Sequence, residues 1–241
     1  MAAQSNSDFH TTRWTLVLQA TGHSDQGQRA LSDLCAAYYE PVVAFLRATG
    51  RDADAAREMA HGFFEELLAK PQLSGAERGR GRFRSYLLGA LKHYLSRRRE
   101  RQQSQKRGGS AEIIPLESGT DTSPGLDPVD HHALPPDREF DRQWALHVLQ
   151  RAMMELEQEW KTAGGRAAEF TQLQPFIGGD AEHGAIAVLA EQRGENSATL
   201  RKTISRLRHQ FRQLVKSEIT PTLTSSDEAD AEMRELLAAL G

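Results

Sequence analysis

The chain has 241 residues, of which 39% are hydrophobic and 26% charged, and its formal net charge is −3. This composition is typical of a globular protein and excludes a wholly disordered one, and no apolar run approaches the roughly 18 residues of a membrane span. Cys35 is the only cysteine, so neither an internal disulfide nor a cluster of thiolate ligands can form. The start of the chain lacks the basic-then-apolar pattern of a signal peptide, and we therefore expect a cytoplasmic protein.

Hydrophobic residues recur at helical spacing along most of the chain, and no run alternates as a strand would, which predicts an all-α fold. The first helix is expected over about 28–46, bent or broken at Pro41. The second is expected over 54–68, with Asp52 or Asp54 as its cap. Later helices are expected over 83–108, 140–160, 170–176, 186–192, 197–216 and 233–240.

The composition divides the chain into two small helical domains, 1–109 and 139–220. Between them, 110–138 is rich in proline, glycine and acidic residues, as linkers are. An acidic tail, 221–241, ends in a short amphipathic helix. We hypothesise that this tail covers a basic helix and restrains the binding of that helix, and the alternative is a plain solvated tail.

The segment from Ala190 to Arg212 has the pattern of a helix-turn-helix. Gly194 supplies the turn, because a positive φ is inexpensive for glycine, and Asn196 or Ser197 caps the helix that follows. Side chains near the start of such a helix reach base edges, and neighbouring cations bind phosphates. The alternative is a solvated cationic face. The candidate DNA-contacting residues here are Ser197, Arg201, Lys202, Ser205 and Arg206.

Arg193 departs from the pattern, because the shorter helix would ordinarily bury an aliphatic residue at this position.

The stretch between Arg78 and Arg107 carries eleven Lys and Arg residues, and Glu100 is the only acidic residue within it. Aromatic rings interleave with these cations, an arrangement typical of surfaces that bind single-stranded nucleic acid. Phe83 and Tyr94 are expected in the buried stripe of the helix instead. The candidate DNA-contacting residues are Arg82, Arg84, Tyr86, Lys92, His93, Arg97, Arg98 and Arg101, with Tyr86 and His93 left open between core and contact.

These pieces, in this order, resemble a sigma-70 family transcription initiation factor of the short extracytoplasmic-function (ECF) group. The resemblance covers most of the chain. It is carried by 11–14, 54–68, 82–88, 105–109, 144–146 and 206–208.

The resemblance implies that the chain binds core RNA polymerase and directs promoter-specific initiation, with catalysis left to the polymerase and no cofactor required. The helix 56–68 would dock on the clamp coiled coil, and 82–101 would engage the −10 element and the melted non-template strand. The helix 197–212 would read the −35 element while its domain packs on the polymerase flap. The polymerase-contacting residues would be Glu58, His61, Glu65 and Glu66. His61 and Gly62 replace a Gln-Glu pair that is common in the family.

Two other classes of protein fit less of the sequence. A stand-alone helix-turn-helix regulator would account for the C-terminal half but not for the first basic helix. An enzyme is disfavoured, because the nine histidines never fall into metal-ligand spacing with cysteine or carboxylates and no glycine-rich phosphate loop precedes a helix. Whether an anti-sigma protein, a kinase or the tail would restrain the factor is left open by the sequence.

Overall fold

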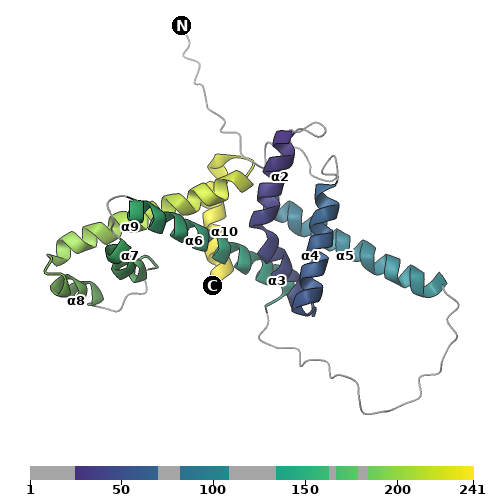
Figure 1. Cartoon of the computed structure of the whole chain (residues 1–241), viewed down its shortest axis with the longest axis horizontal. Helices are drawn as coiled ribbons and strands as arrows, with labels where there is room; N and C mark the ends of the chain where they lie inside the picture. The colour runs from purple at the N-terminus through teal and green to yellow at the C-terminus, as the bar shows by residue number, and fades with distance from the viewer. Residues whose placement is uncertain (1–24, 70–81, 109–133, 163–166, 179–183) are drawn as a thin grey trace, which may run out of the picture. The chain divides into compact units, whose positions relative to one another are not determined.

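The computed structural model describes residues 25–69, 82–108, 134–162, 167–178 and 184–241, and these ranges are largely helical (Figure 1). Their regular elements are α-helices and short 3-10 helices, without a strand anywhere in these ranges. The all-α fold predicted from the periodicity is therefore confirmed for the described part of the chain. No helix within these ranges has the length and hydropathy to span a bilayer.

Contacts divide the chain into two compact units, which we call the N-terminal unit (Arg13–Gln143) and the C-terminal unit (from Trp144 to Gly241). The N-terminal unit contains α2 (Asp25–Ala37), α3 (Tyr39–Ala48), α4 (Ala53–Leu68), α5 (Phe83–Gly108) and the start of α6 (Pro136–Thr162). The C-terminal unit contains the rest of α6, α7 (Ala167–Leu173), η1 (Gln174–Phe176), α8 (Ala185–Gln192), α9 (Ser197–Ile219), η2 (Thr220–Thr222), η3 (Ser226–Glu228) and α10 (Ala229–Leu240).

The break in the first predicted helix lies about one turn earlier than expected. α2 ends at Ala37 and α3 begins at Tyr39, so Tyr38 and not Pro41 marks the interruption. Pro41 has no N–H to donate to the carbonyl of Ala37, and its ring would crowd that carbonyl in a continuous helix. In α3, Pro41 falls in the first turn, where its nitrogen needs no partner within the helix.

Tyr38 lies at the centre of the core of the N-terminal unit. Its ring meets the edge of Phe83 at 5.2 Å between centroids and stacks near Phe140 at 6.2 Å. Both phenylalanines are fully buried. The junction of α2 and α3 therefore anchors the start of α5 and the start of α6.

Two helix starts in this unit follow from local chemistry. Asp52 caps α4, because its Oδ1 accepts the amide of Ala55 at 2.8 Å, as one of the two predicted caps. α6 begins at Pro136 and not near Phe140, inside the end of the predicted linker. Proline is favoured at the first position of a helix, where a missing N–H costs nothing. The remainder of the predicted linker, 110–133, lies outside the described residues, as does the segment 11–14.

The core of the C-terminal unit joins α6, α7, η1, α8 and α9. Its buried members include Leu156, Phe170, Leu173, Phe176, Ile177, Ala190, Leu200, Ile204 and Leu207. Leu200, Ile204 and Leu207 repeat every three or four residues, so one face of α9 is fixed inward. The opposite face of α9 is thereby turned to solvent.

α10 confirms the helix predicted in the tail, and it packs against α9. Leu236 is fully buried, as is Ile219 near the end of α9. Leu237, the next residue along, is 60% exposed. The tail is therefore part of the folded C-terminal unit.

Candidate nucleic-acid interface

The turn between α8 and α9 is short and contains a glycine, as the turn of a helix-turn-helix commonly does. Gly194 adopts φ +63°, a backbone conformation that favours glycine, and the amide of Glu195 donates to the Ala190 carbonyl at 2.9 Å. Asn196 caps α9, because its Oδ1 accepts the amide of Ala198 at 2.8 Å. The turn and cap expected at these positions are both present.

The outer face of α9 presents most of the candidate residues to solvent. Ser197, at the first helical position, is half-buried. Four candidates are exposed on the side of α9 away from Leu200 and Ile204: Arg201, Lys202, Ser205 and Arg206. The structure therefore brings all five together near the start of one helix.

Two neighbouring residues of α9 were not selected from the sequence. His209 and Arg212 are exposed and continue the outer face beyond Ser205. They follow Ser205 by four and seven residues, and residues at this spacing share one face of a helix. The sequence alone could therefore have placed them among the candidates. Arg208 has another role, because its Nε donates to the backbone carbonyl of Phe176 at 2.9 Å and ties α9 to η1.

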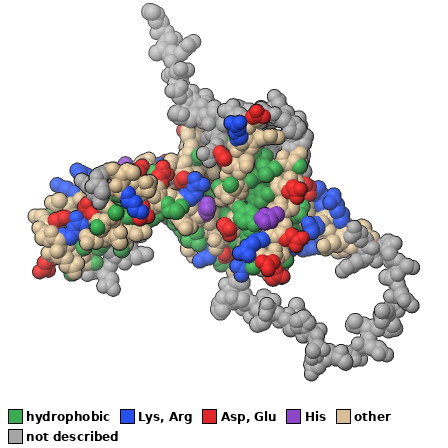
Figure 2. All heavy atoms as spheres, viewed as in Figure 1, with side chains coloured by type: hydrophobic (Ala, Val, Ile, Leu, Met, Phe, Trp, Pro, Cys, Tyr) green, Lys and Arg blue, Asp and Glu red, His purple; other side chains and the backbone are tan. Residues whose placement is uncertain are grey.

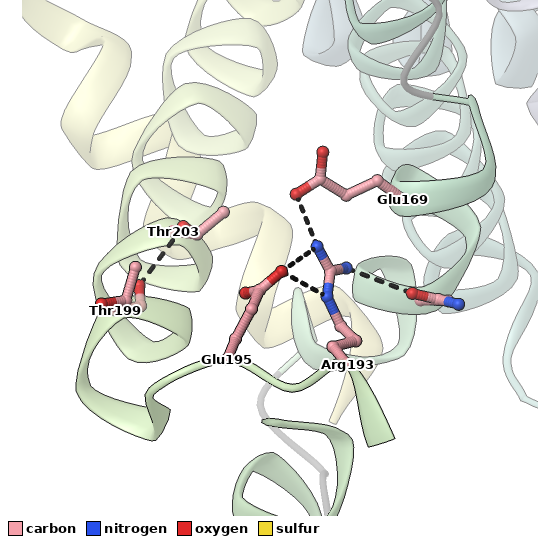
Figure 3. Close-up of polar contacts among 6 residues, drawn as sticks. Glu169, Arg193, Glu195, Thr199 and Thr203 are labelled. Carbon is pink, nitrogen blue, oxygen red and sulfur yellow. Dashed lines mark hydrogen bonds and ion pairs between the residues drawn. The ribbon is translucent and has the colours of Figure 1, made fainter. Parts of the chain in front are cut away.

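Arg193 lies beside this interface and is bound within the protein (Figure 3). Its Nη2 lies 3.0 Å from Oε1 of Glu169 and 2.8 Å from Oε1 of Glu195. Its Nη1 donates to Oε1 of Gln172 at 3.1 Å. The hydrogen bond to Glu195, followed by that to Glu169, raises the pKa of the Arg193 guanidinium above its ordinary value.

The candidate residues at the start of α5 are divided between core and surface. Phe83 and Tyr94 are buried, as predicted. Arg84 is also buried, and its guanidinium forms an ion pair with Asp141 of α6. Lys92 is exposed, and its Nζ lies 2.6 Å from Oδ2 of Asp137. Arg82 is half-buried and has interactions within the protein.

A groove of about 580 Å³ runs between α4 and α5, lined by both aromatic and charged side chains. Tyr86 lines it and is half-buried, and burial raises the pKa of its hydroxyl to about 12. His93, which is exposed, and Arg97 line it as well. The structure thus places Tyr86, His93 and Arg97 around one groove.

Three arginines follow along α5, and two are held by residues of the unit. Arg97 forms an ion pair with Glu66 of α4. Arg98 donates to the hydroxyl of Tyr94 at 3.0 Å. Arg101 is exposed and, with Arg97 and Arg98, lines a second groove of about 420 Å³.

Gly62 explains how Tyr94 reaches this position. A Cβ atom at Gly62 would lie 2.9 Å from the Tyr94 hydroxyl oxygen, closer than real Cβ contacts allow. The glycine thus makes room for the hydroxyl that holds Arg98. Glycine in a helix interior is less favourable than alanine by about 1 kcal/mol. The close packing of the Tyr94 hydroxyl explains why this position, which departs from the family pattern, holds a glycine.

Three of the four predicted polymerase-contacting residues lie exposed on α4: Glu58, His61 and Glu65. Glu66 is half-buried and faces Arg97. His61 stacks on Tyr39 at 5.4 Å between centroids, and its Nε2 lies 2.8 Å from the Tyr39 hydroxyl. Figure 2 shows a histidine bordered by hydrophobic and acidic side chains where α3 and α4 face the viewer.

No group of three or more His, Cys, Asp or Glu side chains suited to a metal ion occurs among the described residues. Comparison of the chain with family models, with curated proteins and with solved structures finds no match in any of the three.

Proposed function

We propose that this protein is a sigma-70-type transcription initiation factor of the ECF group, which binds core RNA polymerase and recognises promoter DNA. The observation that carries the proposal is the capped helix-turn-helix of α8 and α9, whose exposed outer face gathers Arg201, Lys202 and Arg206. A surface of this kind suits the major groove, where arginine and lysine pair with guanine and with phosphates.

The N-terminal unit supplies the second support for the proposal. In α5, Tyr86 and His93 line one groove, and the exposed Arg98 and Arg101 line a second groove that shares Tyr94 with the first. Rings for stacking beside cations for the backbone suit a melted single strand, which the −10 element becomes during initiation. A stand-alone regulator would have no use for this second surface.

In this proposal α4 contacts the polymerase through Glu58, His61 and Glu65, which are exposed together on one helix. Glu66 is removed from the proposed contact set, because it already pairs with Arg97. Arg84 is likewise removed from the proposed DNA contacts, because it is buried against Asp141. Its role in the proposal is to fix α5 on the start of α6.

The experiment that tests the proposal is capture of the full chain by purified core RNA polymerase. We expect stoichiometric binding by the wild type and its loss in the triple variant E58A/H61A/E65A. The control D25A/E40A removes the same number of exposed carboxylates from α2 and α3 of the same unit, and it should bind as the wild type does. A circular dichroism melt of each variant checks that the fold is retained.

The outcomes separate two classes of protein. Capture that the α4 variant abolishes and the control does not would support an initiation factor. A wild-type chain that binds duplex DNA in a sequence-dependent way but ignores the polymerase would be a stand-alone regulator, and the proposal would then be wrong.

A further inference from the structure

Arg193 joins three segments of the C-terminal unit at one guanidinium (Figure 3). Glu169 and Gln172 approach it from α7, and Glu195 approaches it from the turn that precedes α9. The Arg193 side chain is only 16% exposed, although it is charged. The charge of Arg193 is therefore paired within the protein, between α7 and the α8–α9 turn.

An arginine in this corner acts differently from an aliphatic residue. Aliphatic contacts are non-directional, whereas the planar guanidinium binds acceptors in fixed directions. Loss of the guanidinium alone leaves two carboxylates without their cation, but the side chains of Glu169 and Glu195 are 27% and 37% exposed, so water can solvate their charges. The main consequence of Arg193 is therefore expected in the geometry of the turn, more than in the free energy of unfolding.

The geometry that Arg193 fixes is that of the first turn of α9. Glu195, held by both Nε and Nη2 of Arg193, is followed directly by the capping residue Asn196. Asn196 in turn accepts the amide of Ala198 at its side chain and that of Leu200 at its backbone carbonyl. Hydrogen bonds thus join α7 to Arg193 and Arg193 to Glu195, and the peptide bond from Glu195 to Asn196 connects them to the cap of α9.

We propose that Arg193 is a positioning residue for DNA reading: it aims the first turn of α9 without itself touching DNA. The proposal rests on the DNA-reading role of α9 given above. Base-edge contacts require close alignment, whereas phosphate contacts tolerate small displacements because charge attraction is long-ranged. Loss of Arg193 should therefore weaken binding to the preferred sequence more than binding to unrelated DNA.

The test uses the full chain and a library of random-sequence duplexes, from which the wild type selects a preferred sequence. Affinities are then measured for that duplex and for a scrambled one. In R193M we expect the ratio of the two affinities to fall about tenfold, the size of the effect of one mispaired base edge. Affinity for the scrambled duplex should stay close to that of the wild type. R193K should not restore the ratio, because a single ammonium cannot reproduce the planar fork that binds α7 and the α8–α9 turn at once.

The matched control is R151M, which removes an ion pair of similar kind at another place in the same unit. Arg151 Nε lies 2.9 Å from Oε2 of Glu218, away from the α8–α9 turn in sequence. R151M should leave the ratio of affinities unchanged. An equal loss of affinity for both duplexes in R193M would overturn the positioning role.

Amide hydrogen exchange at Ala198 and Leu200 tests the same interaction without DNA. Exchange at these two amides should be faster in R193M than in the wild type or in R151M. Unchanged exchange would show that Arg193 does not hold the turn, and the proposal would fall. A wild-type chain that selects no sequence would overturn the DNA-reading function of α9, and the exchange result would then decide by itself whether Arg193 holds the turn.

Discussion

At the residue scale, the burial of Cys35 should make the stability of the protein depend on pH. Burial raises the pKa of its thiol from 9.0 to about 12, because the thiolate is poorly solvated in the core. A folded-state pKa above the unfolded value means that the thiol contributes stability below pH 9, which is lost as the pH rises towards 12. Cys35 should also resist thiol reagents until the protein unfolds.

Urea unfolding of the wild type and C35A at pH 8 and pH 10.5 measures this contribution. The wild type should lose about 2 kcal/mol more than C35A between the two pH values, from a slope of about 1.4 kcal/mol per pH unit. The comparison with C35A removes the titration of surface lysines and the part of the Tyr86 shift that comes from burial, while the smaller part caused by Cys35 belongs to the measured difference. An equal loss in both proteins would contradict the burial of this thiol.

Two glycines in helix interiors should respond to alanine in opposite ways. At Gly89 a Cβ atom meets nothing within 4 Å, so G89A should stabilise the protein by about 0.5–1 kcal/mol. At Gly62 it would press on the hydroxyl of Tyr94, whose ring is buried and packs on Phe63 at 5.6 Å. Overpacking costs about 1–3 kcal/mol and alanine returns about 1 kcal/mol of helix propensity, so G62A should destabilise the protein by up to about 2 kcal/mol.

The double variant G62A/Y94F identifies the cause. Removing the hydroxyl removes the close approach, so the two substitutions should be non-additive and G62A should be tolerated in Y94F. Thermal melts of the four proteins supply the comparison. Stabilisation by G62A to the same extent as G89A would show that the hydroxyl moves aside freely.

At the scale of elements, the packing of α10 can be tested by two substitutions in that helix. Leu236 is fully buried and Leu237 is 60% exposed, so the two adjacent leucines form a matched pair. L236A should cost about 3 kcal/mol of the free energy of unfolding, and L237A less than about 0.5 kcal/mol. Denaturant unfolding of both variants gives the comparison, and equal effects would contradict the packing of α10.

The tail hypothesis is better tested by charge than by truncation, since removing residues after Thr220 would also remove Leu236 from the core. Asp230 lies 2.5 Å from Nζ of Lys216, and this hydrogen bond is the first cause of the lowered pKa of Asp230. At a rise of about 1.5 Å per residue, Lys216 lies about 22 Å along α9 from Arg201. The cation that Asp230 binds is therefore at the other end of α9 from the candidate DNA-contacting residues. D230N keeps α10 in place, so stronger DNA binding in D230N would support masking, and unchanged binding would oppose it.

For the whole molecule, the proposed function assigns duplex DNA to α9 and melted DNA to α5. K202A/R206A should lower affinity for duplex DNA and reduce the slope of log K against log salt by about 0.9 for each phosphate that the variant no longer neutralises. R98A/R101A should instead lower affinity for a single-stranded oligonucleotide. Fluorescence anisotropy over a range of salt concentrations measures both. Equal effects of both double variants on both kinds of DNA would contradict this division.

Local features of the chain were predicted well because they depend on neighbours within one helical turn. Asp52 caps α4, Asn196 caps α9 and Gly194 takes a positive φ, as the order of residues around them indicated. Pro41 was misjudged by about one turn, because the carbonyl it disturbs belongs to Ala37.

The candidate site could be predicted by helix but not by residue. Nothing in the pattern of α5 distinguishes Arg84 from Arg98, yet the first is buried and the second is exposed. The sequence marks Arg193 only as a departure, a cation where the shorter helix would ordinarily bury an aliphatic residue, and does not indicate what binds it. Its acceptors on α7 precede it by more than twenty residues, and no local pattern joins them to the turn.

The sequence by itself determined the all-helical fold, the caps, the turn before α9 and the two helices that concentrate the positive charge. Only the tertiary structure decided which of those charges face solvent. Arg84 meets its acid 57 positions away, Arg97 meets Glu66 31 positions away, and Arg193 meets Glu169 24 positions away. Helix formation is governed by residues three and four apart, whereas the fate of each charge depends on which distant helix packs against it.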